Sequence, residues 1–312
     1  MDTTTVLLFA CVCGGAFIWG IVNVLKSHLL RDKEVHEDLV TVGVMLGATV
    51  TSFAIEFAWH GLPTVQMAFW APFAITAALN IFIQYGQVKA LKLEQASVVA
   101  PLASTMPLWV ILASWLILGE YPTFWGKVGI VTVSVGAYVI ALKGTPVELP
   151  LFGKRIIPKR YQETVLFYTA PWIRLFSSRG AQIALGIACL GAISSNFDKL
   201  ATLASSPMVF TGGAFLVVAV FVYGWSKATG TWDTLDKTYF GRVFTLGLIQ
   251  GVATVLMNTG YFFGIVPYVG SLKRTQIFWT VMLAGLFLGE SHMGIRLVSA
   301  LIIFVGAALM AF

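Results

Sequence analysis

Long uncharged runs make up most of the chain, and charged residues lie mainly in the short segments between them. A helix needs about 20 mostly apolar residues to cross the hydrocarbon core of a bilayer. The run that starts at Val243 is too long for one span, and Pro267 is best tolerated near the start of a helix, so we place a break near Ile265. The pattern predicts ten membrane-spanning helices, at 4–25, 39–59, 66–89, 95–118, 124–142, 181–203, 207–227, 242–264, 267–288 and 294–312.

The composition excludes a water-soluble domain. Hydrophobic residues make up 58% of the 312 positions and charged residues only 11%, whereas soluble domains carry roughly 25% charged residues. The net charge of +6 does not indicate nucleic-acid binding, because that needs clustered surface Lys and Arg, and here the basic residues are spread over the connections. We therefore expect an all-α integral membrane protein that contacts the lipid bilayer and no nucleic acid.

Basic residues are distributed unevenly between the two sets of connections. Most follow odd-numbered predicted helices, as Arg31 and Arg242 do, whereas Lys127 and Lys199 lie on the opposite face. Basic loops stay on the cytoplasmic side of the cytoplasmic (inner) membrane. This bias predicts that both termini lie outside and that the central loop 143–180 is cytoplasmic.

Part of the central loop mixes aromatic residues with arginines, between Arg160 and Ser178. That mixture suits the headgroup layer of a membrane. Pro171 would break a continuous helix there, so a segment at the interface and a plain linker remain equally open.

The second half of the chain repeats part of the first at a fixed offset. Each half has an odd number of predicted helices, so the second half enters the membrane from the opposite side. Inverted repeats of this kind are typical of secondary transporters, whose substrate site lies between the repeats; a duplicated scaffold without transport is the alternative. The predicted divisions are a first repeat at 1–142, the central loop at 143–180 and a second repeat at 181–312. The matching positions are Leu102 and Leu272, Thr105 and Thr275, Trp109 and Trp279, Leu118-Gly119-Glu120 and Leu288-Gly289-Glu290, and Val135-Gly136-Ala137 and Val305-Gly306-Ala307.

Several short motifs occur in an order that resembles the EamA-like branch of the drug/metabolite transporter superfamily. They are Phe17-Ile18-Trp19-Gly20, Lys89-Ala90-Leu91, Pro107-Leu108-Trp109 and the two Leu-Gly-Glu tripeptides. The resemblance covers nearly the whole chain except 143–180 and implies a ten-helix transporter built as two inverted five-helix repeats. Many members of the family are drawn with cytoplasmic termini, whereas the basic loops here predict the reverse.

Lys273 and Arg274 are the strongest candidates for substrate binding, because charges inside a membrane span are costly and usually functional. Their repeat partners, Ala103 and Ser104, are uncharged, so the repeat itself does not require the charge. The pair resembles the Lys-Arg of phosphate-translocating members of the superfamily. That resemblance implies that both residues bind an anionic group, Arg through its planar fork and Lys as a point charge. The alternative is a structural pair that bonds helix ends or headgroups.

Two further charged groups lie near predicted helix ends. Glu56 and His60 are four residues apart and share a helix face, which allows a proton relay, but a carboxylate reaching the interface is the favoured reading. Asp198 and Lys199 are adjacent, do not face one another, and are expected at the interface.

Uncharged polar side chains form two stripes in equivalent helices of the two halves. Unpaired amides in hydrocarbon are costly, so the stripes either hold helices together or line a substrate path. Trp109 and Trp279 could stack on a substrate or pack structurally. The stripes are Asn80, Gln84 and Gln87, and Gln250, Thr254, Asn258 and Tyr261.

No enzyme or cofactor signature is present in the sequence. A glycine-rich phosphate loop is missing, and the four histidines have no metal-ligand spacing. We therefore predict no metal or cofactor, and a secondary transporter of a small anionic or zwitterionic metabolite that works by alternating access, as a monomer or a homodimer. The alternatives are a cation or drug exporter of the same superfamily and a non-transporting membrane sensor or scaffold.

Overall fold

The computed structural model describes residues 2–29, 35–142, 162–288 and 293–312, and every regular element in these ranges is a helix. Within these ranges, eight helices are by length and composition apolar enough to cross a membrane. The prediction of an all-helical membrane protein with several spans is therefore confirmed. The eight are Thr3–Leu29, Glu37–Trp59, Met67–Leu93, Val98–Leu118, Phe124–Ala141, Arg179–Leu203, Pro207–Ala228 and Lys237–Phe262.

The chain forms two compact units, and each unit combines segments from both halves of the sequence. The boundaries fall inside α3 (Trp70–Leu93) and α9 (Arg179–Leu203), so each of these helices belongs to both units. The predicted repeats divide the sequence differently from these units. The first unit contains residues 1–78 and 197–290, and the second unit contains residues 79–196 and 291–312.

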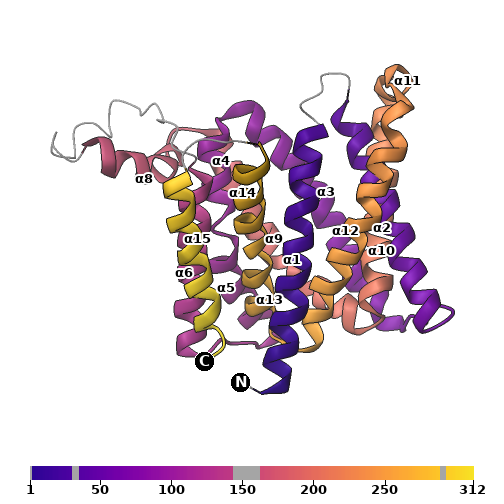
Figure 1. Cartoon of the computed structure of the whole chain (residues 1–312), viewed down its shortest axis with the longest axis horizontal. Coiled ribbons are helices and arrows are strands. Elements are labelled where there is room, and N and C mark those ends of the chain that lie inside the picture. The colour runs from indigo at the N-terminus through magenta and orange to yellow at the C-terminus, as the bar shows by residue number, and fades with distance from the viewer. Residues whose placement is uncertain (1, 30–34, 143–161, 289–292) are drawn as a thin grey trace. The chain divides into compact units, whose positions relative to one another are not determined.

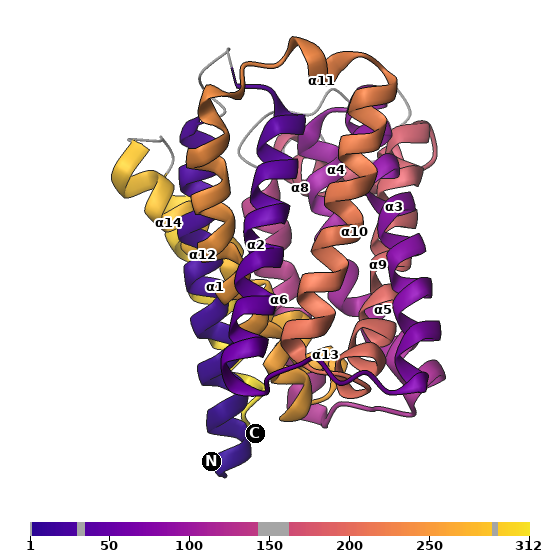
Figure 2. The ribbon, with the colours of Figure 1, turned by 90° about the vertical axis from the view of Figure 1, so that its right-hand side faces the viewer.

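Glycines allow close helix packing in the first unit. A Cβ on Gly47 would lie 2.2 Å from the Phe244 carbonyl oxygen, and a Cβ on Gly43 would lie 2.8 Å from the Val243 side chain. These contacts fix α2 and α12 in a parallel arrangement, with α1 on another side of α12 and α10 beside α2 (Figures 1 and 2). The helices are α1 (Thr3–Leu29), α2 (Glu37–Trp59), α10 (Pro207–Ala228) and α12 (Phe240–Thr259).

The α1 helix runs antiparallel to α12 and to the 3-10 turn η3 (Gly260–Phe262) that follows it. A Cβ on Gly15 would lie 2.7 Å from Met257 Cγ, and a Cβ on Gly260 would lie 2.3 Å from Val12 Cγ2. The residue number in α1 rises from Val12 to Gly15 while the number of the contacting residue falls from Gly260 to Met257, so the two segments are antiparallel. This register sets the depth at which polar side chains of the two helices meet.

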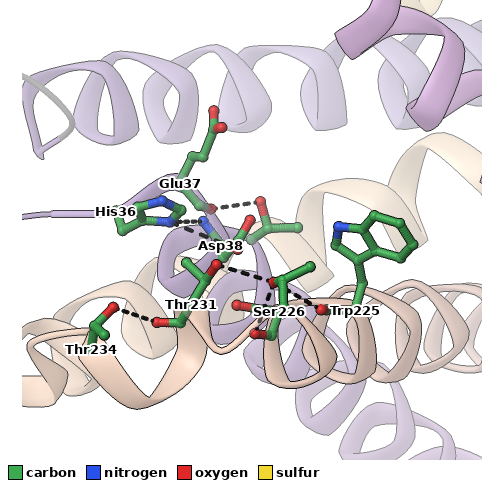
Figure 3. Close-up of polar contacts among 9 residues, drawn as sticks. His36, Glu37, Asp38, Trp225, Ser226, Thr231 and Thr234 are labelled. Atoms are coloured by element: carbon green, nitrogen blue, oxygen red, sulfur yellow. Dashed lines mark hydrogen bonds and ion pairs between the residues drawn. The ribbon is translucent and has the colours of Figure 1, made fainter.

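Side chains satisfy the free backbone groups where α2 begins and α10 ends (Figure 3). His36 is the N-cap of α2, and its Nδ1 accepts a hydrogen bond from the Asp38 N–H at 3.2 Å. At the end of α10, the Thr229 hydroxyl donates to the carbonyl oxygens of Trp225 and Ser226, each at 3.1 Å. Both helix ends therefore have the partners that a helix terminus needs.

In the second unit, α6 and α15 pack closely along their length (Figure 1). A Cβ on Gly129 would lie 2.5 Å from the Gly306 carbonyl oxygen, and a Cβ on Gly136 would lie 2.7 Å from Ile303 Cγ1. Close packing through small residues is the usual way in which helices associate in lipid. The helices specific to this unit are α4 (Ala96–Ala103), α5 (Met106–Leu118), α6 (Phe124–Ala141), α8 (Gln162–Arg174) and α15 (Met293–Leu309).

Two helices that the sequence pattern predicts as continuous, 95–118 and 267–288, are broken. In both, a threonine hydroxyl donates to the carbonyl oxygen three residues earlier, Thr105 to Leu102 and Thr275 to Leu272, each at 2.7 Å. This bond competes with the helical backbone pattern and divides each helix in two. The pieces are α4 and α5 in one case, and α13 (Val266–Lys273) and α14 (Thr275–Leu288) in the other.

The first Leu-Gly-Glu motif ends α5. Gly119 is the C-cap and has φ of 67°, a left-handed conformation that glycine adopts without steric cost. The second motif includes residues 289 and 290, which lie outside the described residues. In the central loop, residues 143–161 also lie outside them, whereas α8 continues as a helix through Pro171, so the prediction that this proline breaks the helix is wrong. Proline removes one backbone donor, and the turn on either side remains helical.

Candidate functional site

Lys273 lies at the break between α13 and α14 in the first unit. It is the last residue of α13, and Arg274 is the C-cap; both side chains are half-buried. The end of a helix carries partial negative charge from unpaired carbonyl groups, which favours a cation there. The break therefore places two basic residues where helical backbone is interrupted, as in the discontinuous helices that bind substrates in transporters.

Uncharged groups hold the Lys273 ammonium. Its Nζ donates to Asn258 Oδ1 at 2.8 Å and to the Tyr261 hydroxyl at 3.1 Å, and lies 4.4 Å from the centre of the Tyr261 ring. Asn258 in turn donates from Nδ2 to Thr211 Oγ1 at 2.8 Å, which orients its oxygen toward the lysine. The Asp198 carboxylate is close enough to interact electrostatically with the Lys273 ammonium.

Asp198 and Lys199 lie in α9 and have partners in the first unit. Thr76 of α3 donates its hydroxyl to Asp198, and Lys199 donates to the Gly264 carbonyl oxygen at 3.0 Å. Gly264 immediately precedes the α13 segment, so Lys199 satisfies a backbone acceptor next to the broken helix. Both side chains thus have partners within the protein, and their expected position at the membrane interface stays a prediction.

Gln250, a predicted site residue, pairs with a lysine that sequence reasoning missed. Lys26 Nζ donates to Gln250 Oε1 at 2.7 Å. The pattern places Lys26 in a basic loop just beyond a helix ending at residue 25, but α1 continues to Leu29 and Lys26 lies inside it. A single charge at the edge of an apolar run does not reveal whether it faces water or a neighbouring helix.

Glu56 and His60 do share a helix face, and their side chains meet. His60 Nδ1 lies 3.2 Å from Glu56 Oε2, and the Ser206 hydroxyl donates to the same oxygen at 2.7 Å. Glu56 is only 2% exposed, so its carboxylate is enclosed by neighbouring side chains, and its position at the interface stays a prediction. Ser206 is the N-cap of α10, and its hydroxyl oxygen accepts from the Val209 N–H at 3.0 Å.

The predicted stripe of α3 is only partly engaged in the second unit. Asn80 Nδ2 approaches Ser194 Oγ at 3.5 Å, whereas Gln84 is exposed. A pair that the sequence does not single out is better ordered: Ser114 donates to Asn196 Oδ1 at 2.7 Å, and Asn196 is fully buried. The Asn80 and Asn196 contacts join α9 to α3 and α5.

The two tryptophans of the repeat have structural contacts. Trp109 donates its indole N–H to Thr105 Oγ1 at 3.2 Å, at the α4–α5 break. Trp279 packs edge-to-face against Phe17 at a ring distance of 4.9 Å, and a Cβ on Gly20 would lie 2.6 Å from its own Cβ. These contacts favour the packing interpretation for Trp279.

Comparisons with known proteins show what the N-terminal part resembles. Residues 6–142 match the model of the EamA-like transporter family. A solved crystal structure, described only as that of a protein, aligns with a TM-score of 0.70 over 100% of this chain and 99% of that chain at 16% sequence identity, which shows a shared fold alone. No curated protein matches the chain. Over residues 6–142 the chain is therefore similar to the EamA-like transporter family, which is part of the drug/metabolite transporter superfamily.

Proposed function

We propose that the protein is a secondary transporter that moves a small anionic or zwitterionic metabolite across the cytoplasmic membrane by alternating access. One observation supports the substrate class: the Lys273 ammonium lies at a helix break and donates to a neutral amide and a phenol. Positive charge in hydrocarbon is costly and is retained where it binds something. Lys273, with Arg274 next to it, supplies that charge to a carboxylate or phosphate.

The proposal includes ten spans arranged as two inverted repeats. The α13–α14 pair would be the ninth span and α15 the tenth, in addition to the eight helices that are long enough by themselves. The identical threonine bonds at the α4–α5 and α13–α14 breaks support a duplicated origin. Both termini would lie outside and the central loop in the cytoplasm, as the basic residues favour.

The test is a metabolite screen followed by a flux assay. Purified protein is screened for thermal stabilisation by a library of small anionic and zwitterionic metabolites, and stabilising compounds are tested for counterflow in proteoliposomes. Lys273→Met should lower the flux by about tenfold or more, since a hydrogen bond to a charged group contributes about 1.5–3 kcal/mol. Lys227→Met is the matched control, because Lys227 is exposed and pairs with Asp233. Absence of counterflow with every compound, or equal flux in the Lys273 variant, contradicts the proposal.

A cation exporter of the same superfamily is the second candidate, and the burial of Glu56 favours it. Such an exporter needs a carboxylate inside the membrane, and Glu56 is 2% exposed. In this case Glu56→Gln should abolish transport, and Lys273→Met should leave it unchanged. The same two variants therefore separate the two candidates in one assay.

A further inference from the structure

The buried side-chain amide of Gln250 has only one of its two polar atoms hydrogen-bonded to a described residue of the first unit. The side chain is 1% exposed, and its Oε1 accepts from Lys26. Among the described residues, its Nε2 has no hydrogen-bond partner. A buried donor without an acceptor is costly, and it usually marks a place that a water molecule or a ligand occupies.

Lys26 extends toward the interior of the unit, although it lies near the end of α1. The antiparallel register pairs Val12 with Gly260 and Gly15 with Met257, which places the Lys26 backbone at the level of Leu246. Gln250 lies four residues further along α12, about 6 Å deeper along the helix axis. Lysines near helix ends normally extend toward water. This one extends inward onto a buried amide.

Among the described residues, Lys26 contacts an amide and an aromatic ring. Its ammonium lies 5.9 Å from the centre of the Trp19 ring, and one turn earlier Asn23 approaches the Thr280 hydroxyl of α14 at 3.4 Å. In the part of the chain that the structure describes, the Lys26 ammonium donates one hydrogen bond, to Gln250. The ammonium has three donors, so two remain for another acceptor.

We infer that the Lys26 ammonium and the Gln250 Nε2 together bind an oxyanion, as a second anion station on the route of the transported metabolite. This inference rests on the proposed function. An oxygen of a carboxylate or phosphate accepts from both donors at once, whereas a cation or an apolar group satisfies neither.

The two stations share one helix. Gln250 and Asn258 are eight residues apart on α12, which separates them by about 12 Å along the axis and about 80° around it. Between them, Thr254 donates its hydroxyl back to the Gln250 carbonyl oxygen at 2.9 Å. Each of these two residues accepts a hydrogen bond from one lysine, Gln250 from Lys26 of α1 and Asn258 from Lys273 of α13. An anion that leaves Lys273 would thus reach a second positive charge further along α12.

A lipid headgroup presents the same oxyanion chemistry, so the experiment must separate the two sources. Purified protein in a phosphate-free maltoside detergent is treated with an amine-methylating reagent, and the labelling rate of each lysine is followed by mass spectrometry. The probes are inorganic phosphate and, separately, succinate. A third arm uses nanodiscs that contain phosphatidylglycerol and no soluble anion.

The expected result is that a soluble probe slows the labelling of Lys26 and Lys273 but not of the exposed Lys227. At a probe concentration ten times its Kd the slowing should be about tenfold, since about one site in ten is then free. Gln250→Glu keeps a partner for Lys26 and places a carboxylate where the anion would bind. In that variant protection of Lys26 should be lost while protection of Lys273 persists.

Three outcomes overturn the inference. If a soluble probe slows the labelling of Lys273 but not of Lys26, the second station does not exist, and the proposed function is unaffected. Protection of Lys26 by phosphatidylglycerol alone identifies a headgroup contact. Protection of neither lysine by phosphate, by succinate or by any transported metabolite from the screen removes the second station together with the anionic substrate class.

Discussion

Replacing Lys273 with methionine separates a functional lysine from a structural one. The side chain gives up two hydrogen bonds, to Asn258 and Tyr261, at 2.8 Å and 3.1 Å. Bonds to a charged group contribute about 1.5–3 kcal/mol each, which would suggest a loss of about 3–6 kcal/mol. The substitution also removes the cost of burying an ammonium, which is several kcal/mol. The two effects nearly cancel.

We therefore expect Lys273→Met to change the free energy of unfolding by no more than about 1 kcal/mol, while transport falls by about tenfold or more. Asn258→Leu should instead lower the free energy of unfolding by about 2 kcal/mol, because it removes an acceptor from a lysine that stays charged. In the double variant both partners are apolar, and most of that loss should be recovered.

The assay is unfolding in mixed detergent–lipid micelles, combined with counterflow on the same preparations. Thr211→Val serves as a control, because it removes one neutral bond, worth about 0.6 kcal/mol in membrane proteins, and leaves both the Lys273 ammonium and its Asn258 acceptor present. The reasoning is refuted if Lys273→Met destabilises by more than about 2 kcal/mol and still transports, since Lys273 would then be a structural tie between α13 and α12.

Three further changes test the fold. Gly47→Ala should destabilise by about 1–3 kcal/mol, because its Cβ would lie 2.2 Å from a carbonyl oxygen of α12. Gly14→Ala, with nothing within 4 Å, should be neutral or stabilising by up to about 1 kcal/mol in the same thermal unfolding assay. Ser206→Ala removes the N-cap of α10 and the donor to Glu56, and should cost about 1–2 kcal/mol; an unchanged unfolding midpoint would show that α10 does not depend on this cap. Outside the spans, the Thr238 hydroxyl and N–H hold the pKa of Asp236 below its usual value. The ionised carboxylate therefore stabilises the fold at neutral pH. This contribution is lost as the pH falls through the folded-state pKa. The difference in melting temperature between wild type and Asp236→Asn should accordingly be small, present at pH 7, and absent below about pH 3.

The presence of the helices and their approximate ends followed from the length of the apolar runs. In the hydrocarbon core the backbone N–H and C=O groups must bond to one another, and a single segment achieves this by forming a helix. The break near Ile265 is one example: η3 ends at Phe262 and α13 begins at Val266. The breaks at Thr105 and Thr275 were not predicted. They depend on side-chain hydroxyls that bond backward, which hydropathy does not register.

Partners of the polar residues required three-dimensional information. The spacing of Glu56 and His60 predicted their contact, since both lie on one helix. The spacing did not predict that Ser206, 150 residues later, buries the same carboxylate. Asn196 was overlooked because it sits among small residues in an apolar run, with no periodic polar stripe to mark it.

The sequence by itself determined that this chain is helical and resides in a membrane, because these properties depend on composition and on the length of the apolar runs. The related halves and the Lys-Arg pair inside a span stay predictions from local spacing. Tertiary structure alone decided that Lys273 binds Asn258 and that Lys26 extends inward onto Gln250. Those contacts depend on which helices lie side by side and at what register. Close approach at glycines such as Gly15 and Gly47 sets that register, and no local pattern along one helix encodes the position of its neighbour.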